Sequence, residues 1–523
     1  MKYWLLLVLL FPTIAMAQRR VDLIINNARI IDGTGNPWYK GSIAVKKGKI
    51  VRVGFLGSMK AKTIIDAKNE IVAPGFIDVY THIEGDEVKN PTADNFIYDG
   101  VTTVITGNCG ESRVDIATYF QLLKDTKLSV NVATLIGHND VRQRVMGTAN
   151  RAPTLQEQAQ MEQLVALAMQ QGAVGLSTGL IYIPGTYAAT AEVVGLAKQA
   201  ARYNGVYATH MRTESDSVLV AIAEALQIGR EANIPVEISH FKVSGQQNWG
   251  RSKETVAAIE AARKEGLEVT IDQYPYTASS TSLSTLLPES ILADGNDSIK
   301  ARLQRPQQKA FVISEMLRSL KRRGLDHFSY AVVANYEADT TMNGKSIEQV
   351  NLAKGRAHTA AAEAETVIDM MLQGGAGMVF HGMSEDDVEH IMKYPFNMFA
   401  SDASIRVYRQ GVPHPRGYGT NARVLAKYVR QRNLLPLEEA IRRMTSLPAQ
   451  KFNLKNRGLL MEGKAADIVI FNEQNVQDNS TFDNPHQYST GFSYVMVNGK
   501  VVVDNGKHNG QRNGQVLYGK GSL

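Results

Sequence analysis

Cysteine is almost absent from this chain, because Cys109 is the single cysteine among 523 residues. One cysteine cannot form an internal disulfide, so the sequence excludes a disulfide-stapled scaffold. Left alone, Cys109 would be a small buried apolar residue. A metal ion with further ligands would instead hold it as a thiolate, so the rest of the sequence has to supply those ligands.

Long apolar runs and blocks of like charge are also missing from most of the chain. No segment after residue 20 approaches about 18 uninterrupted apolar residues, so we expect no membrane-spanning helix in the mature chain. The formal net charge of +6 is spread along the sequence without a Lys/Arg block. This distribution favours solubility over a nucleic-acid-binding face. We therefore expect a small-molecule partner and no nucleic acid.

The one marked apolar run lies at the N-terminus, in "MKYWLLLVLLFPTIAMAQRR" (residues 1–20). A lysine, an apolar run too short to span a membrane and the sequence Ala15-Met16-Ala17 predict a secretory signal peptide cleaved after Ala17. No cysteine follows the cleavage site, so we expect no lipid anchor. The interpretation is an exported protein, placed in a bacterial periplasm or outside the cell.

Both ends of the mature chain contain short alternating segments separated by Asn, Gly and Asp turns. Near the N-terminus these include "VDLIINNARIIDGTG" and "GSIAVKKGKIVRVG", and near the C-terminus "ADIVIFN" and "YVMVNGKVVVDNGK", with Asn498-Gly499 as a hairpin turn. Such patterns indicate antiparallel strands. We predict one discontinuous β-rich domain, a small β-sandwich, built from residues 18–72 and 441–523.

The middle of the chain, residues 73–440, alternates strand and helix patterns. Eight candidate strands with helical crossovers predict a (β/α)8, TIM-like barrel. The gap between the seventh and eighth strands exceeds a normal crossover, which predicts an inserted subdomain at about residues 283–375. The candidate strands are "FIDVYTH", "VTTVITG", "VNVATLI", "AVGLSTG", "VYATH", "VEISH", "EVTIDQY" and "NMFASD".

Polar residues stand at the C-terminal ends of several of these strands. In such a barrel these ends converge on one mouth, where functional groups are held. A thiol and several imidazoles at correctly phased strand ends predict a metal site. Three ligands of this kind suit Zn²⁺ and leave a fourth position for water or substrate. The residues at the strand ends are His82, Cys109, His210, His240, Tyr274 and Asp402.

Asp402 ends the eighth strand and is the expected general acid–base. A zinc ion would polarise a carbonyl group and acidify its water. A carboxylate at Asp402 would then take the proton of that water and later protonate a leaving nitrogen.

Over nearly its whole mature length, the sequence resembles the N-acyl-D-amino-acid deacylases (D-aminoacylases) of the amidohydrolase superfamily. The ordered stretches that carry the resemblance are "PGFIDV", "GNCG", "PGTYAATAEVVGLAKQAARYNGVYATHMRTE", "ISHFKVSG", "DQYPYTASST", "MSEDDVEHIMKYPFNMFASD", "HPRGYGT", "RRMTSLPAQKF", "GLLMEGKAADIVIF" and "NPHQYSTGFSYVMVNGKVVVD". The resemblance implies a zinc-dependent enzyme that cleaves the amide of an N-acyl-D-amino acid or of a D-configured dipeptide-like compound.

The resemblance also implies a metal-ligand set. The tightly held zinc of the family would be bound by Cys109, His210 and His240, and Asp402 matches the catalytic aspartate. Many superfamily relatives bridge two metals with a lysine on the fourth strand, but that strand here, "GAVGLSTG", contains none. The second, weaker metal position of the family uses a His-x-His pair on the first strand, where this chain has Tyr80 and His82. We therefore expect one zinc.

Substrate-binding residues follow from the same resemblance. Arg416, in "HPRGYGT", matches the arginine expected to bind the substrate carboxylate, a task that suits a guanidinium group. The segment "SDASIRVYRQGVPHPR" is longer than the family's usual spacing between the aspartate and this arginine. The remaining substrate-contact positions are matched by Lys242, Tyr182, Tyr274 and Ser280.

Two alternatives remain open. Related enzymes open cyclic amides such as hydantoins or dihydropyrimidines, a reaction that would use the same zinc site on a different bond. The absence of a lysine on the fourth strand and the presence of "GNCG" and "HPRGYGT" argue against it. A non-catalytic member that has kept the fold is the second alternative, and Tyr80 is its only motivation.

Overall fold

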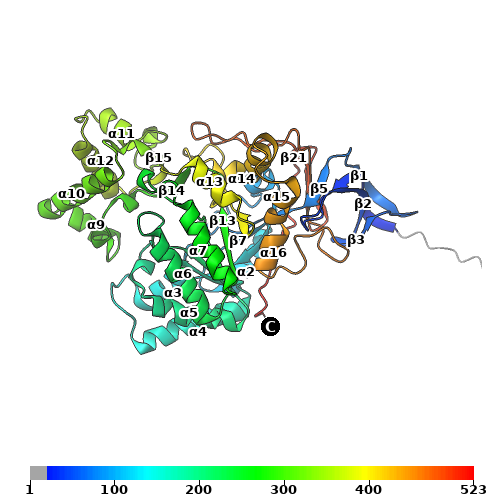
Figure 1. Ribbon diagram of the computed structural model, residues 1–523, viewed down its shortest axis with the longest axis horizontal. Helices are drawn as coiled ribbons and strands as arrows, with labels where there is room; N and C mark the ends of the chain where they lie inside the picture. Colours follow the sequence, from blue (N-terminus) through cyan, green and yellow to red (C-terminus); the bar gives the residue numbers. More distant parts are fainter. Residues whose placement is uncertain (1–19, 523) are drawn as a thin grey trace, which may run out of the picture.

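The computed structural model describes residues 20–522, and the predicted signal peptide therefore lies outside the described residues. A central barrel lies between a β-rich region at one end of the molecule and a mainly helical region at the other (Figure 1). Within residues 20–522, no helix is both long and apolar enough to cross a membrane.

Eight parallel strands form the barrel. They are β6 (Phe76–Asp78), β7 (Val101–Thr106), β8 (Asn131–Thr134) continued by β9 (Ile136–Gly137), β10 (Gly175–Gly179), β11 (Val206–His210), β12 (Val236–Ile238), β13 (Val269–Gln273) and β17 (Asn397–Phe399). Neighbours pair in the order β6–β7–β8 and β9–β10–β11–β12–β13–β17. The ring closes where Thr81 and Ala403, just beyond β6 and β17, form a parallel bridge.

Amphipathic helices return the chain between the strands and cover the outside of the barrel. In α4 (Leu155–Gln171), the Thr154 side chain accepts a hydrogen bond from the Glu157 amide while the Glu157 side chain accepts one from the Thr154 amide, a capping box. The other covering helices are α2 (Ile116–Thr126), α3 (His138–Met146), α5 (Thr190–Arg202), α6 (Val218–Ala232), α7 (Ser252–Lys264), α13 (Glu385–Met392) and α14 (Arg416–Arg423).

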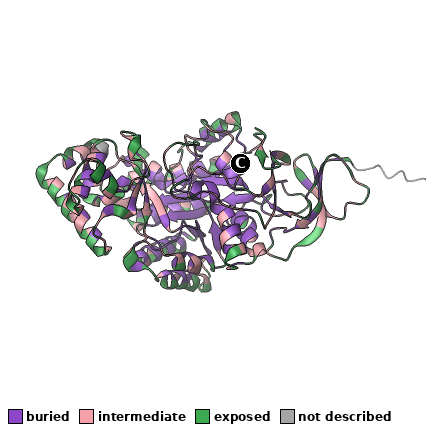
Figure 2. Cartoon of the chain, turned by 90° about the horizontal axis from the view of Figure 1, so that it is seen from above, coloured by how far each residue is buried: buried purple, intermediate pink, exposed green. Residues whose placement is uncertain are grey.

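The barrel interior is a packed core. Figure 2 shows the central strands buried along their length. Side chains that point inward from the strands form one apolar cluster with Leu447 and Ala449 of α16 (Ser446–Lys451). This short helix and the preceding α15 (Leu437–Met444) both contact β6, and most residues of α16 are buried. The polar residues lie at the C-terminal ends of the strands, which form the other end of the barrel.

The β-rich region is one sheet built from both ends of the chain. Its strands are β1 (Arg20–Ile30), β2 (Tyr39–Lys46), β3 (Lys49–Gly54), β4 (Lys60–Asp66), β5 (Ile71–Pro74), β18 (Ile468–Phe471), β19 (Phe492–Val497), β20 (Lys500–Asp504) and β21 (Lys507–His508). The two ends meet where β5 and β18 pair antiparallel. Asn498 and Gly499 both have positive φ, 51° and 74°, and turn β19 into β20 as the sequence predicts.

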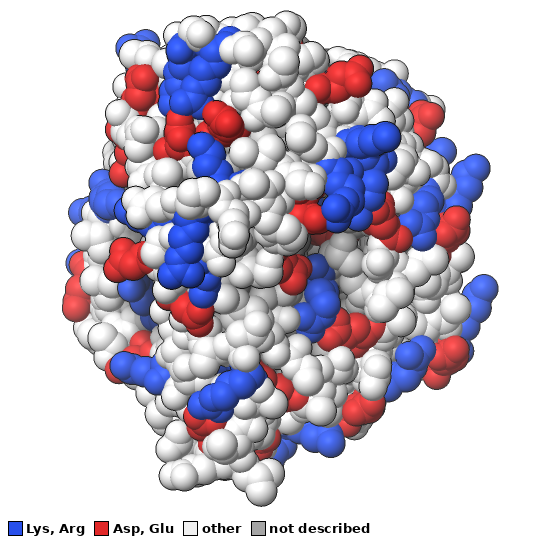
Figure 3. Space-filling model, turned by 90° about the vertical axis from the view of Figure 1, so that its left-hand side faces the viewer, with Lys and Arg blue, Asp and Glu red and all other residues white. Residues whose placement is uncertain are grey.

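The chain between β13 and β17 forms the insert, with its own sheet and core. Strands β14 (Ala278–Ser282), β16 (Gly377–His381) and β15 (Ala331–Asn335) pair antiparallel in that order. Its helices α8 (Glu289–Leu292), α9 (Asn296–Leu303), α10 (Pro306–Arg322), α11 (Ile347–Ala353) and α12 (Ala360–Leu372) enclose a separate apolar cluster. On the face in Figure 3, positive and negative side chains are interspersed. The insertion predicted for residues 283–375 lies inside this segment.

Candidate active site

A cavity of about 530 Å³ opens at the C-terminal ends of the barrel strands. Its walls come from the barrel and also from the insert, through β14 and the residues that follow it. All of the site residues expected from the sequence line this one cavity, although they are spread over more than 300 positions of the chain. They are Tyr80, His82, Cys109, Tyr182, His210, His240, Lys242, Tyr274, Ser280, Asp402 and Arg416.

The thiol and two imidazoles expected to bind a metal lie in direct contact. The Nδ1 atom of His210 is 3.2 Å from Cys109 Sγ and 2.8 Å from His240 Nε2. The two imidazole rings meet edge to face, with centroids 4.3 Å apart. All three residues are buried, so the donor atoms converge at the base of the cavity.

The backbone at these positions is held in an unusual conformation. Cys109, His240 and Asp402 each follow a strand end and have positive φ, at 61°, 36° and 49°. For residues with a side chain, this left-handed region is strained and persists only where the surroundings enforce it. The flanking Gly110 has φ 77°, and a Cβ there would lie 2.3 Å from Asn139 Oδ1. The turn "GNCG" therefore needs a glycine at position 110 to place the Cys109 thiol.

The protonation states fit a metal ion at this position. Burial, together with the neighbouring His240, lowers the pKa of His210 well below its usual value. Burial and Lys242 lower the pKa of His240 in the same direction. Both imidazoles are therefore neutral and able to act as ligands. Burial raises the pKa of the Cys109 thiol well above its usual value, so a nearby cation is needed to hold it as a thiolate.

Glu214 is part of this arrangement, although it was not recognised from the sequence. Its Oε1 atom lies 2.8 Å from His240 Nδ1 and 2.5 Å from Lys242 Nζ. Burial raises the pKa of Glu214, but Lys242 and His240 outweigh that effect and hold the pKa well below its usual value. A carboxylate at Nδ1 favours the His240 tautomer that carries its proton on Nδ1. The Nε2 atom then keeps its lone pair, with which it can bind a metal. The only feature of the sequence that could have pointed to Glu214 is its position four residues after His210.

Asp402 lies between two cationic or ionisable partners. Its Oδ2 atom is 2.9 Å from Arg416 Nη2, and its Oδ1 atom is 3.5 Å from His82 Nε2. Burial raises the pKa of Asp402, but the Arg416 guanidinium and the hydrogen bond with His82 more than offset this, so the pKa lies well below its usual value. Asp402 is therefore an ionised carboxylate, as a proton acceptor must be.

A second carboxyl group positions the Asp402 segment. The Asp78 side chain, at the end of β6, accepts hydrogen bonds from the amides of Tyr80 and Ser401, at 3.2 and 3.1 Å. The Asp402 amide in turn donates to the Tyr80 carbonyl at 3.0 Å. Burial raises the pKa of Asp78 to about 7. These bonds tie the first strand to the eighth beside the cavity.

Arg416 reaches the cavity even though the loop before it is long. Its guanidinium carbon lies 4.5 Å from the ring centre of Tyr274, and its Nη2 donates to the Ser280 carbonyl at 3.4 Å. Two more of its donors, Nε and Nη1, are buried without a hydrogen-bond partner among the described residues. A buried cationic group with unpartnered donors is costly unless an anion joins it.

The other predicted side chains complete the walls. The Tyr182 hydroxyl hydrogen-bonds with Thr281 Oγ1 at 2.8 Å, and its ring lies against His210. Ser280 donates its hydroxyl to the Met378 carbonyl at 2.8 Å, inside the insert sheet. The Tyr80 ring lies edge to face with His240, with centroids 4.7 Å apart. In the described part of the chain, the Tyr80 hydroxyl has no hydrogen-bond partner.

The cavity carries more positive than negative side chains. Lys242, Arg323, Arg406 and Arg416 line it, against Glu111, Glu214 and Asp402. Arg406, in the long segment that follows Asp402, was not recognised from the sequence. It belongs to the same wall as Arg416. Burial lowers the pKa of Arg406, and the positive charge of Arg416 lowers it further. Such a cavity favours an anionic ligand.

Known proteins resemble this chain over nearly its whole length. The Amidohydrolase family model matches residues 63–503. A D-aminoacylase of Alcaligenes xylosoxydans xylosoxydans is 33% identical over 95% of this chain and 97% of its own length. An N-acyl-D-aspartate deacylase of the same organism is 34% identical over 97% and 96%.

A solved structure extends the likeness to the fold. N-acyl-D-glutamate deacylase from Bordetella bronchiseptica, complexed with zinc and a phosphonate inhibitor, matches with a TM-score of 0.81 and 34% identity. The match covers 96% of this chain and 100% of that one, and it confirms the predicted fold class of a barrel with a β-rich domain. The chain belongs to the amidohydrolase family, among the N-acyl-D-amino-acid deacylases.

Proposed function

We propose that this protein is an exported, zinc-dependent hydrolase of N-acyl-D-amino acids. Water is added across the amide bond, which releases a carboxylic acid and a free D-amino acid. The family membership and the named activities of the similar proteins support this choice. We infer the D-configuration of the substrate from those relatives. We infer its carboxylate from the positive side chains that line the cavity.

Arg416 carries the proposal. It is buried, it lines the cavity beside Asp402, and two of its donors have no partner within residues 20–522. A substrate carboxylate would satisfy those donors and would compete with Asp402 for the guanidinium. Binding of the substrate would then free Asp402 for proton transfer, and would place the amide bond next to it.

Cys109, His210 and His240 are the residues that would hold the zinc. A thiolate and two neutral imidazoles form a donor set that suits Zn²⁺ and leaves a position open. When bound, zinc supplies a Lewis acid that polarises the amide carbonyl and acidifies water. Glu214 fixes His240 from its other ring nitrogen, and Lys242 neutralises Glu214.

Asp402 would move the proton in both halves of the reaction. One of its carboxylate oxygens accepts a proton from the attacking water, and the carboxyl group then donates it to the leaving amide nitrogen. His82, 3.5 Å from Asp402 Oδ1, orients the carboxylate. Tyr274 and Tyr182 exclude water from the cavity with their buried or half-buried rings, and Ser280 holds the insert strand that carries the wall.

We further propose that the barrel holds one zinc ion. Tyr80 occupies the place of a second imidazole on the first strand, and burial raises the pKa of its phenol well above the usual value. A neutral phenol is a poor metal ligand. His82 alone then lacks a partner for a second ion and remains available to Asp402.

A panel of substrates tests the proposal. N-acetyl-D- and N-acetyl-L-amino acids, the carboxamides of the same D-compounds and hydantoins are assayed with zinc supplied, using the wild type and Asp402→Asn. We expect turnover of the D-acids, a loss of about 100-fold or more in kcat/KM for the carboxamides, and a loss of at least about 1,000-fold in Asp402→Asn.

Other outcomes point to the alternatives. Turnover of hydantoins alone would favour a cyclic-amide hydrolase. Protein that takes up no zinc and turns over none of these compounds would indicate a non-catalytic member. Unchanged turnover in Asp402→Asn would reject the assignment of the proton carrier.

A further inference from the structure

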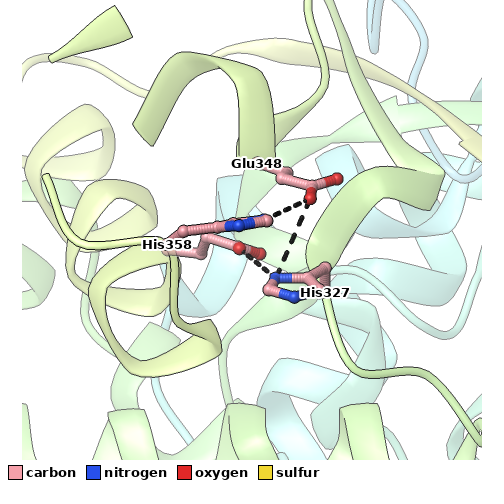
Figure 4. A group of neighbouring side chains, drawn as sticks. His327, Glu348 and His358 are labelled. Atoms are coloured by element: carbon pink, nitrogen blue, oxygen red, sulfur yellow. Dashed lines mark hydrogen bonds and ion pairs between the residues drawn. The ribbon is translucent and has the colours of Figure 1, made fainter. Parts of the chain in front are cut away.

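A second group of imidazoles and carboxylates lies outside the barrel, in the insert. His327 precedes the short 3-10 helix η4 (Phe328–Tyr330), Glu348 is on α11, His358 lies between α11 and α12, and Glu363 is on α12. Each of the four residues offers a ligand atom within 4.8 Å of the others. Figure 4 shows His327 and His358 directed toward Glu348 from different segments.

The contacts within this group form a chain. His327 Nδ1 lies 2.5 Å from Glu363 Oε1 and 4.0 Å from Glu348 Oε1. His358 Nε2 lies 2.6 Å from Glu348 Oε1. The imidazole rings of His327 and His358 are stacked, with centroids 4.3 Å apart. Four donor atoms from four segments thus lie within 4.8 Å of one another.

One carboxylate of this group is buried in the insert, which distinguishes the group from a set of surface contacts. Glu363 is fully buried, and its second oxygen accepts a hydrogen bond from the Phe328 amide at 2.7 Å. Placing a carboxylate in the interior is costly unless positive charge compensates it. A divalent cation bound among these side chains would supply that positive charge.

We propose that His327, Glu348, His358 and Glu363 form a binding site for a divalent transition-metal ion, with Zn²⁺ as the ion to test. Two imidazole nitrogens and two carboxylate oxygens are a donor set suited to Zn²⁺. In a tetrahedral site with bonds of about 2.0–2.1 Å, ligand atoms are about 3.3 Å apart. The distances of 2.5, 2.6 and 4.0 Å bracket this value, so small side-chain rotations suffice.

The site would act as a structural staple of the insert. It joins η4, α11 and α12, which otherwise meet through the apolar cluster of the insert. Tyr330, at the end of η4, and Arg323, at the end of α10, line the cavity. A metal ion at His327 would therefore fix the segment that presents this wall. The inference does not depend on the reaction at the barrel.

Metal content and thermal stability test the site in the full-length protein. The double variant His327→Gln/His358→Gln removes both imidazoles, and His390→Gln, on α13 outside the group, is the matched control. Each protein is loaded with ZnCl₂, passed through gel filtration and assayed for zinc per chain. We expect the wild type and the control to hold one zinc more than the double variant.

Zinc added to chelator-treated protein should also raise Tm more in the wild type than in the double variant, by about 2 °C or more. kcat at saturating substrate should agree within about twofold, because none of the substituted residues lines the cavity. Equal zinc content and equal Tm response in wild type and double variant would overturn the proposal. Glu348→Gln, measured in the same way, replaces the double variant if that protein does not fold.

Discussion

Tyr80 is the residue on which the proposal of one zinc ion in the barrel rests. Its ring lies against those of His240 and His82, at the position where the resemblance to the deacylases predicts a histidine. Tyr80→His should add about one equivalent of zinc per chain, because an imidazole at this place completes a pair with His82. Zinc is measured in a His327→Gln/His358→Gln background, so that the insert does not contribute.

Tyr80→Phe is the control for this experiment, since it removes the hydroxyl without supplying a ligand. Its zinc content should equal that of the parent. If the parent protein already carries two zinc ions in the barrel, the one-zinc hypothesis is wrong.

Lys451 gives a prediction for stability against pH. It ends α16, its side chain is buried, and burial lowers the pKa of its ammonium from 10.5 to about 8 although Glu268 and Glu237 oppose the shift. In the unfolded chain the ammonium keeps its proton up to about pH 10.5. Between pH 8 and 10.5 the unfolded state therefore binds more protons, so this residue's contribution to stability rises with pH.

Lys451→Met should remove that dependence. At pH 7 the variant should be more stable than the wild type, by at most ~3 kcal/mol, because the buried charge is gone. Toward pH 10 the difference should shrink. Urea unfolding at pH 7 and pH 9.5 measures it, with the exposed Lys455→Met as the control. A difference that stays constant across this range would contradict the assigned pKa.

At the level of elements, the turn between β7 and α2 decides whether the thiol is in place. A Cβ at Gly110 would meet Asn139 Oδ1 at 2.3 Å and the Gly179 amide nitrogen at 2.8 Å. Gly110→Ala should therefore displace Cys109, lower the zinc retained after gel filtration and reduce kcat/KM by about 100-fold or more.

Gly266→Ala provides the comparison. Gly266 also has positive φ, at 95°, but none of the described atoms lies within 4 Å of a Cβ built there. Both variants carry the strain of a left-handed alanine, about 1 kcal/mol. Only Gly110→Ala adds a clash, so equal zinc content in the two proteins would show that the turn tolerates the shift.

The elements themselves were largely readable from the sequence, because each depends on local patterns. The eight barrel strands and the residues that end them, such as His210 and Asp402, follow from alternation of apolar runs with amphipathic helices. The partners of those residues were not readable. Glu214 bonds to Lys242 and His240 across 26 to 28 positions, and Asp78 binds the Ser401 amide across 323. The first contacts join the ends of neighbouring strands and the last joins the first strand to the eighth, so neither leaves a local periodicity.

The insert is a different case. Its existence follows from the length of the gap between β13 and β17, but its sheet does not, since β14 and β16 pair across almost 100 residues. For the same reason the sequence did not show that Arg323 and Tyr330 return to the cavity. The histidines and glutamates of the second group also come together only when α11 and α12 pack.

At the scale of the whole molecule, the insert should be separable from the barrel. Its apolar cluster is distinct from that of the barrel. The chain enters the insert through β14 and returns to the barrel through β16, and Ser282 pairs with Gly377 between these two strands. Replacing residues 283–376 by Asn-Gly would close these two strands as a hairpin. The shortened protein should fold and still bind zinc at the proposed site of Cys109, His210 and His240.

Its catalysis should nevertheless weaken in a specific way. The deletion removes Thr285, Leu286, Arg323 and Tyr330 from the cavity wall and leaves Asp402 and Arg416 in place. Those residues line the cavity away from Asp402, so we expect them to affect substrate binding more than proton transfer. KM for an N-acetyl-D-amino acid should rise about tenfold or more, with a smaller change in kcat. Zinc analysis, circular dichroism and steady-state kinetics measure these effects. An unchanged KM would mean that the insert does not contribute to substrate binding, whereas loss of the barrel zinc would mean that it supports the metal site.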